Sequence, residues 1–163
     1  MILRALTVSF VAASLSGCAL FGFEGSPEGS IDSTVTGTDQ AVEQFLTGRQ
    51  LDAVEGAWEH DENAFEVVIS RNQFDIADGY DYVGIITRSD QPTWHNGEVK
   101  ILLRNTNDDG VFEGVWMTRN KSRRQMTFVV EHDNLIQASF VAADGNTYFA
   151  RIRRIQPRFA SAH

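Results

Sequence analysis

The chain of 163 residues contains one cysteine and three prolines. It also lacks any run of about 18 apolar residues, which excludes a helix that spans a bilayer. A single cysteine cannot form a disulfide within the chain. A composition with 42% hydrophobic and 22% charged residues excludes a disordered or fibrous chain. The length corresponds to about one domain, so we expect one small globular domain.

Motifs for catalysis and for metal binding are also missing. The chain contains no Gly-x-Ser-x-Gly, no His-Glu-x-x-His and no glycine-rich phosphate loop. Its histidines are isolated, without the spacing of a metal site; they are His60, His95, His132 and His163. A catalytic group that forms only in space leaves no such signature. From the sequence we expect a protein that is not an enzyme and that has no cofactor and no metal.

Positive charge is scarce as well. The chain has 22 Asp and Glu against 14 Lys and Arg, a formal net charge of −8. This balance argues against nucleic acid as a partner. Two basic clusters remain, at residues 119–124 and 151–158. They are explained either by solvated charge on an outer face or by contact with anionic lipid headgroups or lipopolysaccharide phosphates.

The first 17 residues are typical of a secretory signal peptide. Arg4 supplies a positive start, and residues 5–14 form an apolar run that is too short to cross a membrane. We therefore expect residues 1–17 to be removed from the mature protein.

The residues that end this leader are Leu15-Ser16-Gly17-Cys18, and they resemble the lipobox of bacterial lipoproteins. The resemblance implies cleavage before Cys18, lipidation of its sulfur and acylation of the freed amine. Two or more acyl chains anchor a protein stably to a membrane. The next residue is Ala19, in place of the Asp that retains such proteins at the inner membrane. The resemblance thus implies a bacterial envelope protein, at the outer membrane and facing the periplasm.

A tether and a short helix are expected before the main domain. Residues 18–38 are rich in Gly, Ser and Thr, which predicts a flexible tether. A helix is expected over residues 39–50, capped by Thr38 or Asp39 and ended near Gly48. Its narrow apolar stripe suits a lid or plug packed against another element. The stripe consists of Val42, Phe45 and Leu46.

From residue 51 to 158 the hydrophobic period is two, and turn residues recur regularly, which predicts an all-β domain. The expected strands are 55–60, 64–71, 80–88, 98–105, 111–119, 124–131, 134–141 and 146–155. Short connections make neighbouring strands antiparallel. Eight such strands avoid exposed edges by closing into an up-and-down barrel, which we favour over a two-sheet sandwich. Residues 159–163 are assigned to a tail.

One face of these strands is apolar and is predicted to point inward. Gly84 and Gly114 lie on it, where they permit a bend or a close neighbour. Eight strands enclose a lumen that is either just filled by side chains or able to hold one small ligand. An open lumen would be lined by Tyr80, Tyr82, Ile86, Leu103, Phe112 and Trp116. The opposite face is expected to carry Glu66, Ser70, Asp81, Lys100, Arg104 and Glu113.

The first expected strand opens with Gly56-Ala57-Trp58, which resembles the opening motif of the lipocalins and their wider calycin relatives. In that family the Trp closes the base of the barrel, and an Arg from near the last strand packs across it. The resemblance implies this closing role for Trp58 and for Arg151 or Arg153, with Arg154 in the same region. The family's second motif, a Thr-Asp-Tyr-like turn, is missing from this chain, which favours a looser calycin-like barrel.

Two functions fit these features. In the first, the barrel binds a small apolar ligand or a lipid in its lumen. In the second, the lumen is filled and the protein is a docking or scaffolding module for an envelope partner. Trp94 lies in a long connection at the barrel rim, where it either gates or docks, or folds back over the core.

Overall fold

The computed structural model describes residues 35–156 except 63, 74 and 133. The predicted leader (1–17), Cys18, most of the tether and the tail lie outside the described residues. None of the described helices is long and apolar enough to cross a bilayer.

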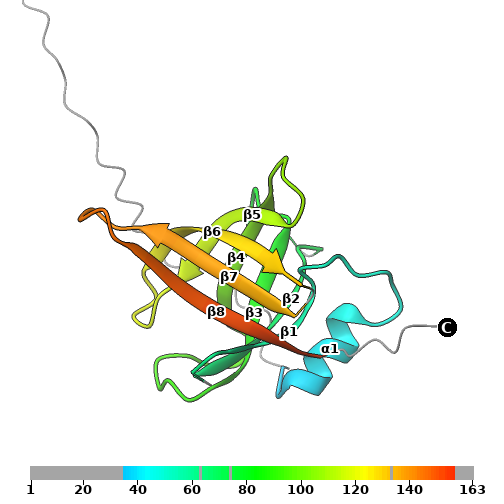
Figure 1. The fold of residues 1–163 in the computed structure, drawn as a ribbon. Helices are drawn as coiled ribbons and strands as arrows, with labels where there is room; N and C mark the ends of the chain where they lie inside the picture. Colours follow the sequence, from blue (N-terminus) through cyan, green and yellow to red (C-terminus); the bar gives the residue numbers. More distant parts are fainter. Residues whose placement is uncertain (1–34, 63, 74, 133, 157–163) are drawn as a thin grey trace, which may run out of the picture.

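The described chain forms one closed antiparallel β-barrel with one short helix (Figure 1). The elements are α1 (Thr38–Leu46), β1 (Gly56–His60), β2 (Phe65–Arg71), β3 (Tyr82–Ser89), β4 (Val99–Asn105), β5 (Val111–Met117), β6 (Arg123–Glu131), β7 (Leu135–Val141) and β8 (Thr147–Gln156). Each strand pairs with the next, and β8 returns to pair with β1, where Trp58 faces Arg154 and His60 faces Ile152. This confirms the predicted up-and-down barrel, and the sandwich is excluded.

Turn chemistry explains the short connections. Gly110 and Gly145 both have positive φ, of 70° and 82°, at the hairpin ends before β5 and β8. Only glycine adopts this conformation without a steric penalty. In the second hairpin the Asp144 carboxylate also accepts the backbone N–H of Asn146 at 3.0 Å, a local bond typical of turns.

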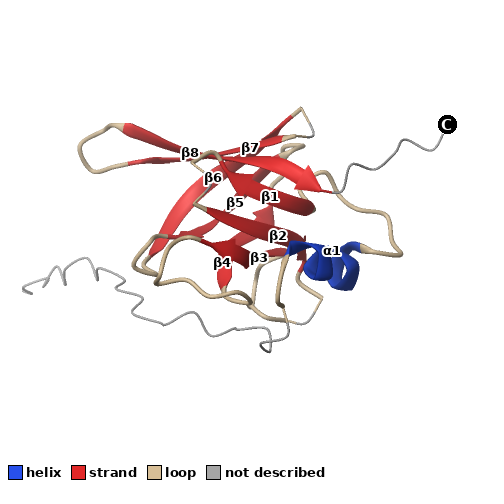
Figure 2. Cartoon of the chain, turned by 90° about the horizontal axis from the view of Figure 1, so that it is seen from below, coloured by secondary structure: helices blue, strands red, loops and turns tan. Residues whose placement is uncertain are grey.

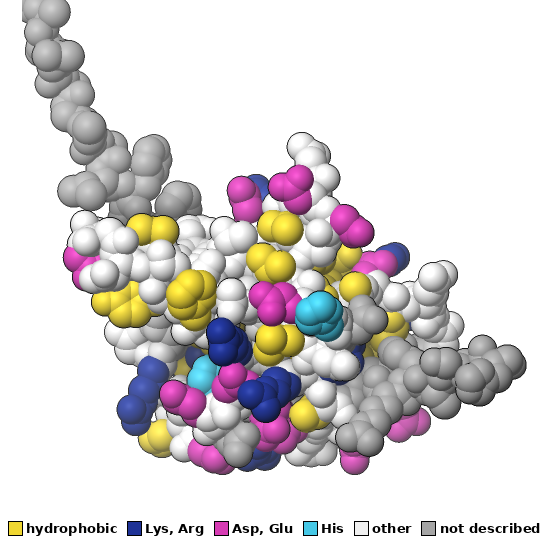
Figure 3. All heavy atoms as spheres, in the orientation of Figure 1, with side chains coloured by type: hydrophobic (Ala, Val, Ile, Leu, Met, Phe, Trp, Pro, Cys, Tyr) yellow, Lys and Arg dark blue, Asp and Glu magenta, His cyan; other side chains and the backbone are white. Residues whose placement is uncertain are grey.

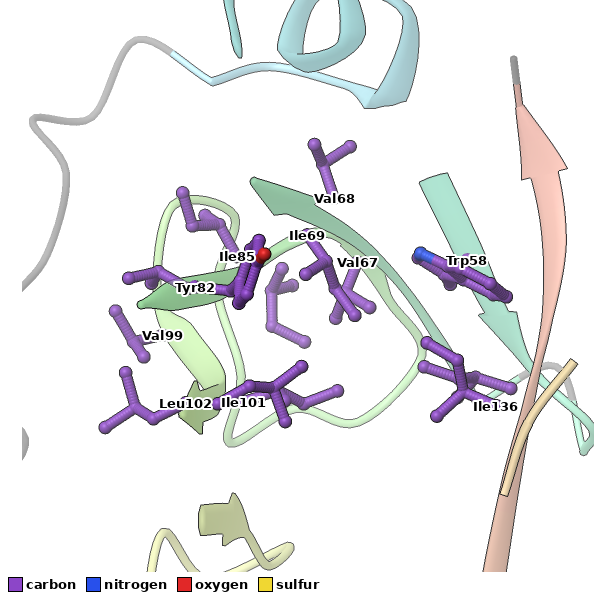
Figure 4. Close-up of a cluster of buried hydrophobic side chains, with 14 of the residues drawn as sticks. Trp58, Val67, Val68, Ile69, Tyr82, Ile85, Val99, Ile101, Leu102 and Ile136 are labelled. Atoms are coloured by element: carbon purple, nitrogen blue, oxygen red, sulfur yellow. The ribbon is translucent and has the colours of Figure 1, made fainter. Parts of the chain in front are cut away.

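The helix is shorter than predicted and lies on the outside of the barrel. It ends at Leu46, and Gly48 follows with φ of 82°. Gly37 is its N-cap, without a side-chain capping bond, so the predicted caps are wrong. The Thr38 hydroxyl bonds Glu66 on β2 instead. Figure 2 shows α1 beside β2 and β3, and in Figure 4 Val68 points toward the helix. The helix therefore covers the outer face of these strands and does not plug the lumen.

Large side chains fill the inside of the barrel. Val67 and Ile69 point away from the helix, into the interior (Figure 4). Eleven of the inward side chains are each at most 8% exposed: Trp58, Phe65, Val67, Ile69, Ile86, Ile101, Leu103, Trp116, Phe128, Ile136 and Ile152. Gly84 permits this packing, because a Cβ there would lie 2.9 Å from the Cβ of Ile101. Burial of such side chains contributes about 25 cal/mol per Å² of apolar surface.

A β-bulge changes which face Lys100 occupies. Gly84 pairs with Ile101, but its neighbour Ile85 pairs with Val99, so Lys100 is an extra residue in β4. A bulge breaks the strict alternation of side chains. Lys100 is 1% exposed, against the rings of Phe65 and Trp116. The prediction that Lys100 lies on the polar outer face is therefore wrong.

Candidate functional site

The two ends of the barrel differ in what surrounds them. We call the end where β4 passes into β5 the open end, because a cavity of about 450 Å³ lies there. We call the opposite end, where β4 begins, the lysine end. The residues that line the cavity at the open end are Asp52, Ala53, Tyr82 and residues 105–112.

Two of the predicted lumen residues form the apolar wall of this cavity. The rings of Tyr82 and Phe112 meet edge to face, with centroids 5.6 Å apart. Both come from the inward face of their strands and are less than 9% exposed. The loop of residues 106–110, which joins β4 to β5, closes one side with polar groups. The cavity therefore combines aromatic surface with a polar rim, which is typical of small-molecule sites.

Hydrogen bonds hold Tyr82 in place. Its hydroxyl donates to the Asp52 carboxylate at 2.7 Å, and the Arg71 guanidinium donates to the same carboxylate at 2.9 and 3.0 Å. Burial opposes ionisation of Asp52, but these hydrogen bonds outweigh it, so the pKa of Asp52 is lowered. Burial and the bond to Asp52 raise the pKa of Tyr82 well above its usual value. At neutral pH the pair is thus a carboxylate that accepts from a neutral phenol.

A buried carboxylate ties the segment before β1 to the barrel. Glu55 is fully buried and forms an ion pair with Arg49, just after α1. It also accepts the backbone N–H groups of Asp52 at 2.9 Å and Arg71 at 2.8 Å. These bonds satisfy the charge that burial would otherwise make costly. Through these contacts the Glu55 carboxylate links Arg49, after α1, to Arg71 at the end of β2.

Trp58 and an arginine lie together at the point where β1 meets β8. The indole is fully buried and donates to the carbonyl of Val54 at 3.0 Å. The guanidinium over its ring is that of Arg154, 4.1 Å from the centroid. The two residues proposed for this role lie elsewhere: Arg153 pairs with Asp61 at 2.8 Å, and Arg151 donates to Gln137. Cross-strand pairing with Trp58 selects Arg154.

The structure places five of the six predicted lumen residues inside the barrel. Ile86 and Leu103 are fully buried, and Tyr82, Phe112 and Trp116 are at most 8% exposed. The sixth, Tyr80, precedes β3, and its hydroxyl is 3.4 Å from the Arg123 guanidinium. Arg123 belongs to the outward row of β6, since its neighbour Arg124 pairs with inward Trp116. Tyr80 therefore packs outside the lumen.

At the lysine end the buried ammonium group of Lys100 lies among aromatic rings. The Nζ of Lys100 is 4.2 Å from the ring centroid of Trp94, 4.9 Å from that of Phe65 and 5.9 Å from that of Trp116. His60 extends the cluster, with its ring 4.9 Å from Phe65. Burial lowers the pKa of Lys100 to about 8. The cation–π contacts act in the opposite direction, because they favour the charged form.

Trp94 covers this cluster from the loop between β3 and β4, residues 90–98, which we call the β3–β4 loop. The indole is 5% exposed, so it folds back over the core. The Thr93 hydroxyl attaches the middle of the loop by donating to the carbonyl of Arg119 at 2.9 Å, and backbone bonds between Ile86 on β3 and Gly97 and Glu98, at 2.8 Å each, attach its end. Two buried polar atoms in it have no hydrogen-bond partner: Nε1 of Trp94 and Oε1 of Gln91. Such atoms cost about 1–3 kcal/mol each when they are removed from water.

His60 is the second titratable group at the lysine end. Its Nδ1 accepts the backbone N–H of Glu62 at 3.3 Å, so a neutral ring carries its proton on Nε2. Burial lowers the pKa of His60, although Glu62 and Asp61 raise it in part. We therefore expect His60 to be neutral at pH 7.

Lys100, Arg49 and Arg154 are the residues that sequence reasoning missed or left unassigned. A signal for Lys100 did exist, since the chain has only two lysines and one of them interrupts an apolar strand. Arg154 follows from the pairing of β1 with β8, which no local pattern specifies. Among the described residues, no group of three or more His, Cys, Asp or Glu could hold a metal ion.

The fold defines a small, closed, eight-stranded antiparallel barrel with a buried aromatic cluster at one end and a cavity at the other. No family model matches this chain, and no curated protein or solved structure shows significant similarity to it.

Proposed function

We propose that this protein is a lipoprotein of the bacterial envelope whose barrel binds a small apolar molecule or lipid at the open end. The observation that carries the binding part is the cavity of about 450 Å³ lined by Tyr82 and Phe112. Sites for small molecules commonly have volumes of about 300–1,000 Å³. The rings supply apolar contact area, and the loop before β5 supplies polar groups that orient the ligand.

The anchoring part is supported by the sequence alone. Cys18 ends a lipobox-like motif, and about 20 residues separate it from α1. As a random coil, such a tether reaches roughly 25 Å. The barrel would then stand clear of the headgroups on the periplasmic face of the outer membrane. In this proposal the membrane is a partner through the lipid anchor, and the protein performs no catalysis.

Binding at the open end is tested with the apolar probe N-phenyl-1-naphthylamine, whose fluorescence rises in apolar sites. Phe112→Leu removes part of the cavity wall, and we expect it to weaken probe binding by about tenfold, equivalent to about 1.4 kcal/mol. Phe149→Leu is the matched control, because Phe149 is 59% exposed on β8. Equal binding by the wild type and both variants would count against this site.

A second measurement asks for the natural ligand. Native mass spectrometry of protein purified from its own envelope should detect a copurified lipid or metabolite. Its absence, together with no probe binding, would remove the ligand-binding function.

The anchor is tested separately by Cys18→Ala. We expect an unprocessed and unlipidated precursor, because the sulfur that receives the lipid is absent. A fully processed product that stays in the membrane fraction would refute the lipidation of Cys18.

A docking or scaffolding module is the second candidate function, and it is favoured by the filled interior and the β7–β8 hairpin. This hairpin extends beyond the other strands (Figure 2), and hydrophobic side chains gather over it in Figure 3. Its exposed apolar residues are Val141, Tyr148 and Phe149. If an envelope protein docks here, Phe149→Ser should lower its recovery in a crosslinking pull-down. Trp94→Ala tests the loop predicted from the sequence in the same way.

A further inference from the structure

The two lysines of this chain lie on the same indole. Twelve of the 14 basic residues are arginine, and the exceptions are Lys100 and Lys121. Both ammonium groups are close to the Trp94 ring, at 4.2 and 5.3 Å from its centroid. All the other Lys and Arg positions of the chain are arginine, so the two side-chain primary amines, those of Lys100 and Lys121, both lie at this end of the barrel.

Lys100 and Lys121 differ in exposure and in ion pairing. Lys121 is one-third exposed and pairs with the Glu98 carboxylate at 2.7 Å. Lys100 is 1% exposed, and none of the ion pairs found among the described residues includes it. A buried cation without a carboxylate is costly to keep charged. Lys100 therefore differs from an ordinary structural lysine in the one property that controls its reactivity, the availability of its lone pair.

We propose that Lys100 is a carbonyl-reactive amine, which binds an apolar aldehyde at the lysine end of the barrel as a reversible imine. This site lies at the opposite end from the cavity at Tyr82 and Phe112, so it does not depend on the function proposed above. The aromatic cluster that surrounds Nζ supplies the apolar surface for such a ligand.

The chemistry balances without an oxidant or a reductant. The Lys100 ammonium first gives a proton to water, and its lone pair then forms a bond to the carbonyl carbon while the C=O π pair moves to oxygen. Transfer of a proton from the nitrogen to this oxygen gives the carbinolamine. Its hydroxyl takes up the proton first given to water and leaves as water, and the nitrogen lone pair forms the C=N bond of the protonated imine. The protonated imine carries the same positive charge as the ammonium, so the ring faces of Trp94 and Phe65 stabilise it as well.

A guanidinium could not do this, because it stays protonated in proteins. The lowered pKa of Lys100, about 8, supports the role: about one-tenth of such an amine is neutral at pH 7. For an ordinary lysine with a pKa of 10.5, the neutral fraction is below about one in a thousand.

Access to Lys100 requires the β3–β4 loop to move. In the closed position this loop leaves Nε1 of Trp94 and Oε1 of Gln91 buried and unpaired. Opening would let water bond to both atoms, which offsets part of the cost of exposing the indole. Gly97, the second-last residue of the loop, has φ of 88°, a conformation in which glycine is unstrained. The part of the loop before Gly97 is thus the segment that moves to uncover Nζ, while the bonds of Gly97 and Glu98 to Ile86 on β3 stay in place.

The test uses the purified full chain with decanal as the probe, followed by reduction with sodium cyanoborohydride to fix any imine. Intact mass reports the adduct, and peptide mapping locates it. We expect labelling of Lys100 at pH 7 to exceed that of Lys121 by at least about tenfold, because the aromatic rings around Nζ of Lys100 bind the apolar chain of decanal. Lys100→Arg should abolish the main adduct, and the matched control Lys121→Arg should retain it. Trp94→Ala should speed the labelling.

Two comparisons make the outcome decisive. The urea-unfolded chain should label both lysines alike, which shows that the selectivity comes from the fold. Glyceraldehyde, a polar aldehyde, should show a smaller preference for Lys100 than decanal does, because it has no apolar chain to bind the aromatic rings. Equal labelling of both lysines in the folded chain, or an adduct mainly on Lys121 or the N-terminal amine, would overturn the proposal. Binding of N-phenyl-1-naphthylamine at the open end is measured independently, so either proposal can fail alone.

Discussion

Replacing Lys100 by methionine should make the protein more stable at neutral pH. The side chains have similar length, so the change removes the buried charge and little else. Burial lowers the pKa of Lys100 from 10.5 to about 8. At about 1.4 kcal/mol per pKa unit, this shift means that holding the ammonium inside the barrel costs roughly 3 kcal/mol at pH 7. The lost cation–π contacts reduce the gain by about 0.5–2 kcal/mol. We therefore expect Lys100→Met to be about 1–2.5 kcal/mol more stable than the wild type.

The sign of the pH dependence follows from linkage. Between pH 8 and 10.5 the unfolded chain keeps a proton on Lys100 that the folded protein has lost. The unfolding free energy of the wild type therefore rises with pH over this window, by roughly 3 kcal/mol in total. Lys100→Met lacks this contribution. Its advantage should shrink as the pH rises above 8, and the wild type should equal or exceed it near pH 10.5.

Urea denaturation of both proteins at several pH values between 7 and 10.5 measures this difference. The raised pKa of Tyr82 is present in both proteins, so its contribution cancels from the difference between them. Lys121→Met is the control, because Lys121 is paired with Glu98 at the surface. A difference between wild type and Lys100→Met that does not change with pH would refute the buried, destabilised ammonium.

Three further predictions concern the barrel frame. Arg154→Met should lower the unfolding free energy by about 1–2 kcal/mol, because it removes the cation that covers the buried indole of Trp58. The control Arg151→Met should change the unfolding free energy by less than about 0.5 kcal/mol. Gly114→Ala should destabilise by about 1–3 kcal/mol or more in thermal unfolding, since the new Cβ would lie 2.0 Å from the carbonyl oxygen of Leu102. Glu55→Ala should lower the unfolding free energy, measured by urea denaturation, by about 3–5 kcal/mol, because it removes the carboxylate that pairs with Arg49 and accepts two backbone N–H groups. A loss below about 1 kcal/mol would show that this carboxylate does not tie the segment before β1 to the barrel.

Strand positions were the most predictable part of the fold. The expected strand 111–119 begins where β5 does, and the expected strand 64–71 differs from β2 by one residue at its start. Alternation of apolar side chains and turn residues are local signals, so they are present in the sequence itself. The expected helix ran to residue 50 and was too long, because α1 ends at Leu46; the left-handed Gly48 follows that end, as the sequence predicted.

The candidate site was less predictable, for a physical reason. Lys100 was expected on the outer face because strict alternation places it there, but the bulge against Ile85 inserts it as an extra residue. Tyr80 was expected in the lumen because it matches Tyr82 in period, yet β3 begins only at Tyr82. A bulge or a strand end depends on the partner strand and is invisible in one segment. The same holds for Arg154, which β1 selects through pairing.

From its sequence alone, this chain specifies an all-β domain of eight antiparallel strands, because hydrophobic period and turn chemistry act within a few residues. The tertiary structure alone decides that large side chains fill the interior, that Arg154 covers Trp58, and that Lys100 lies among aromatic rings beneath Trp94. These features arise from contacts between segments up to about a hundred residues apart. Their energies depend on the register in which distant strands meet, and that register forms only when the barrel closes.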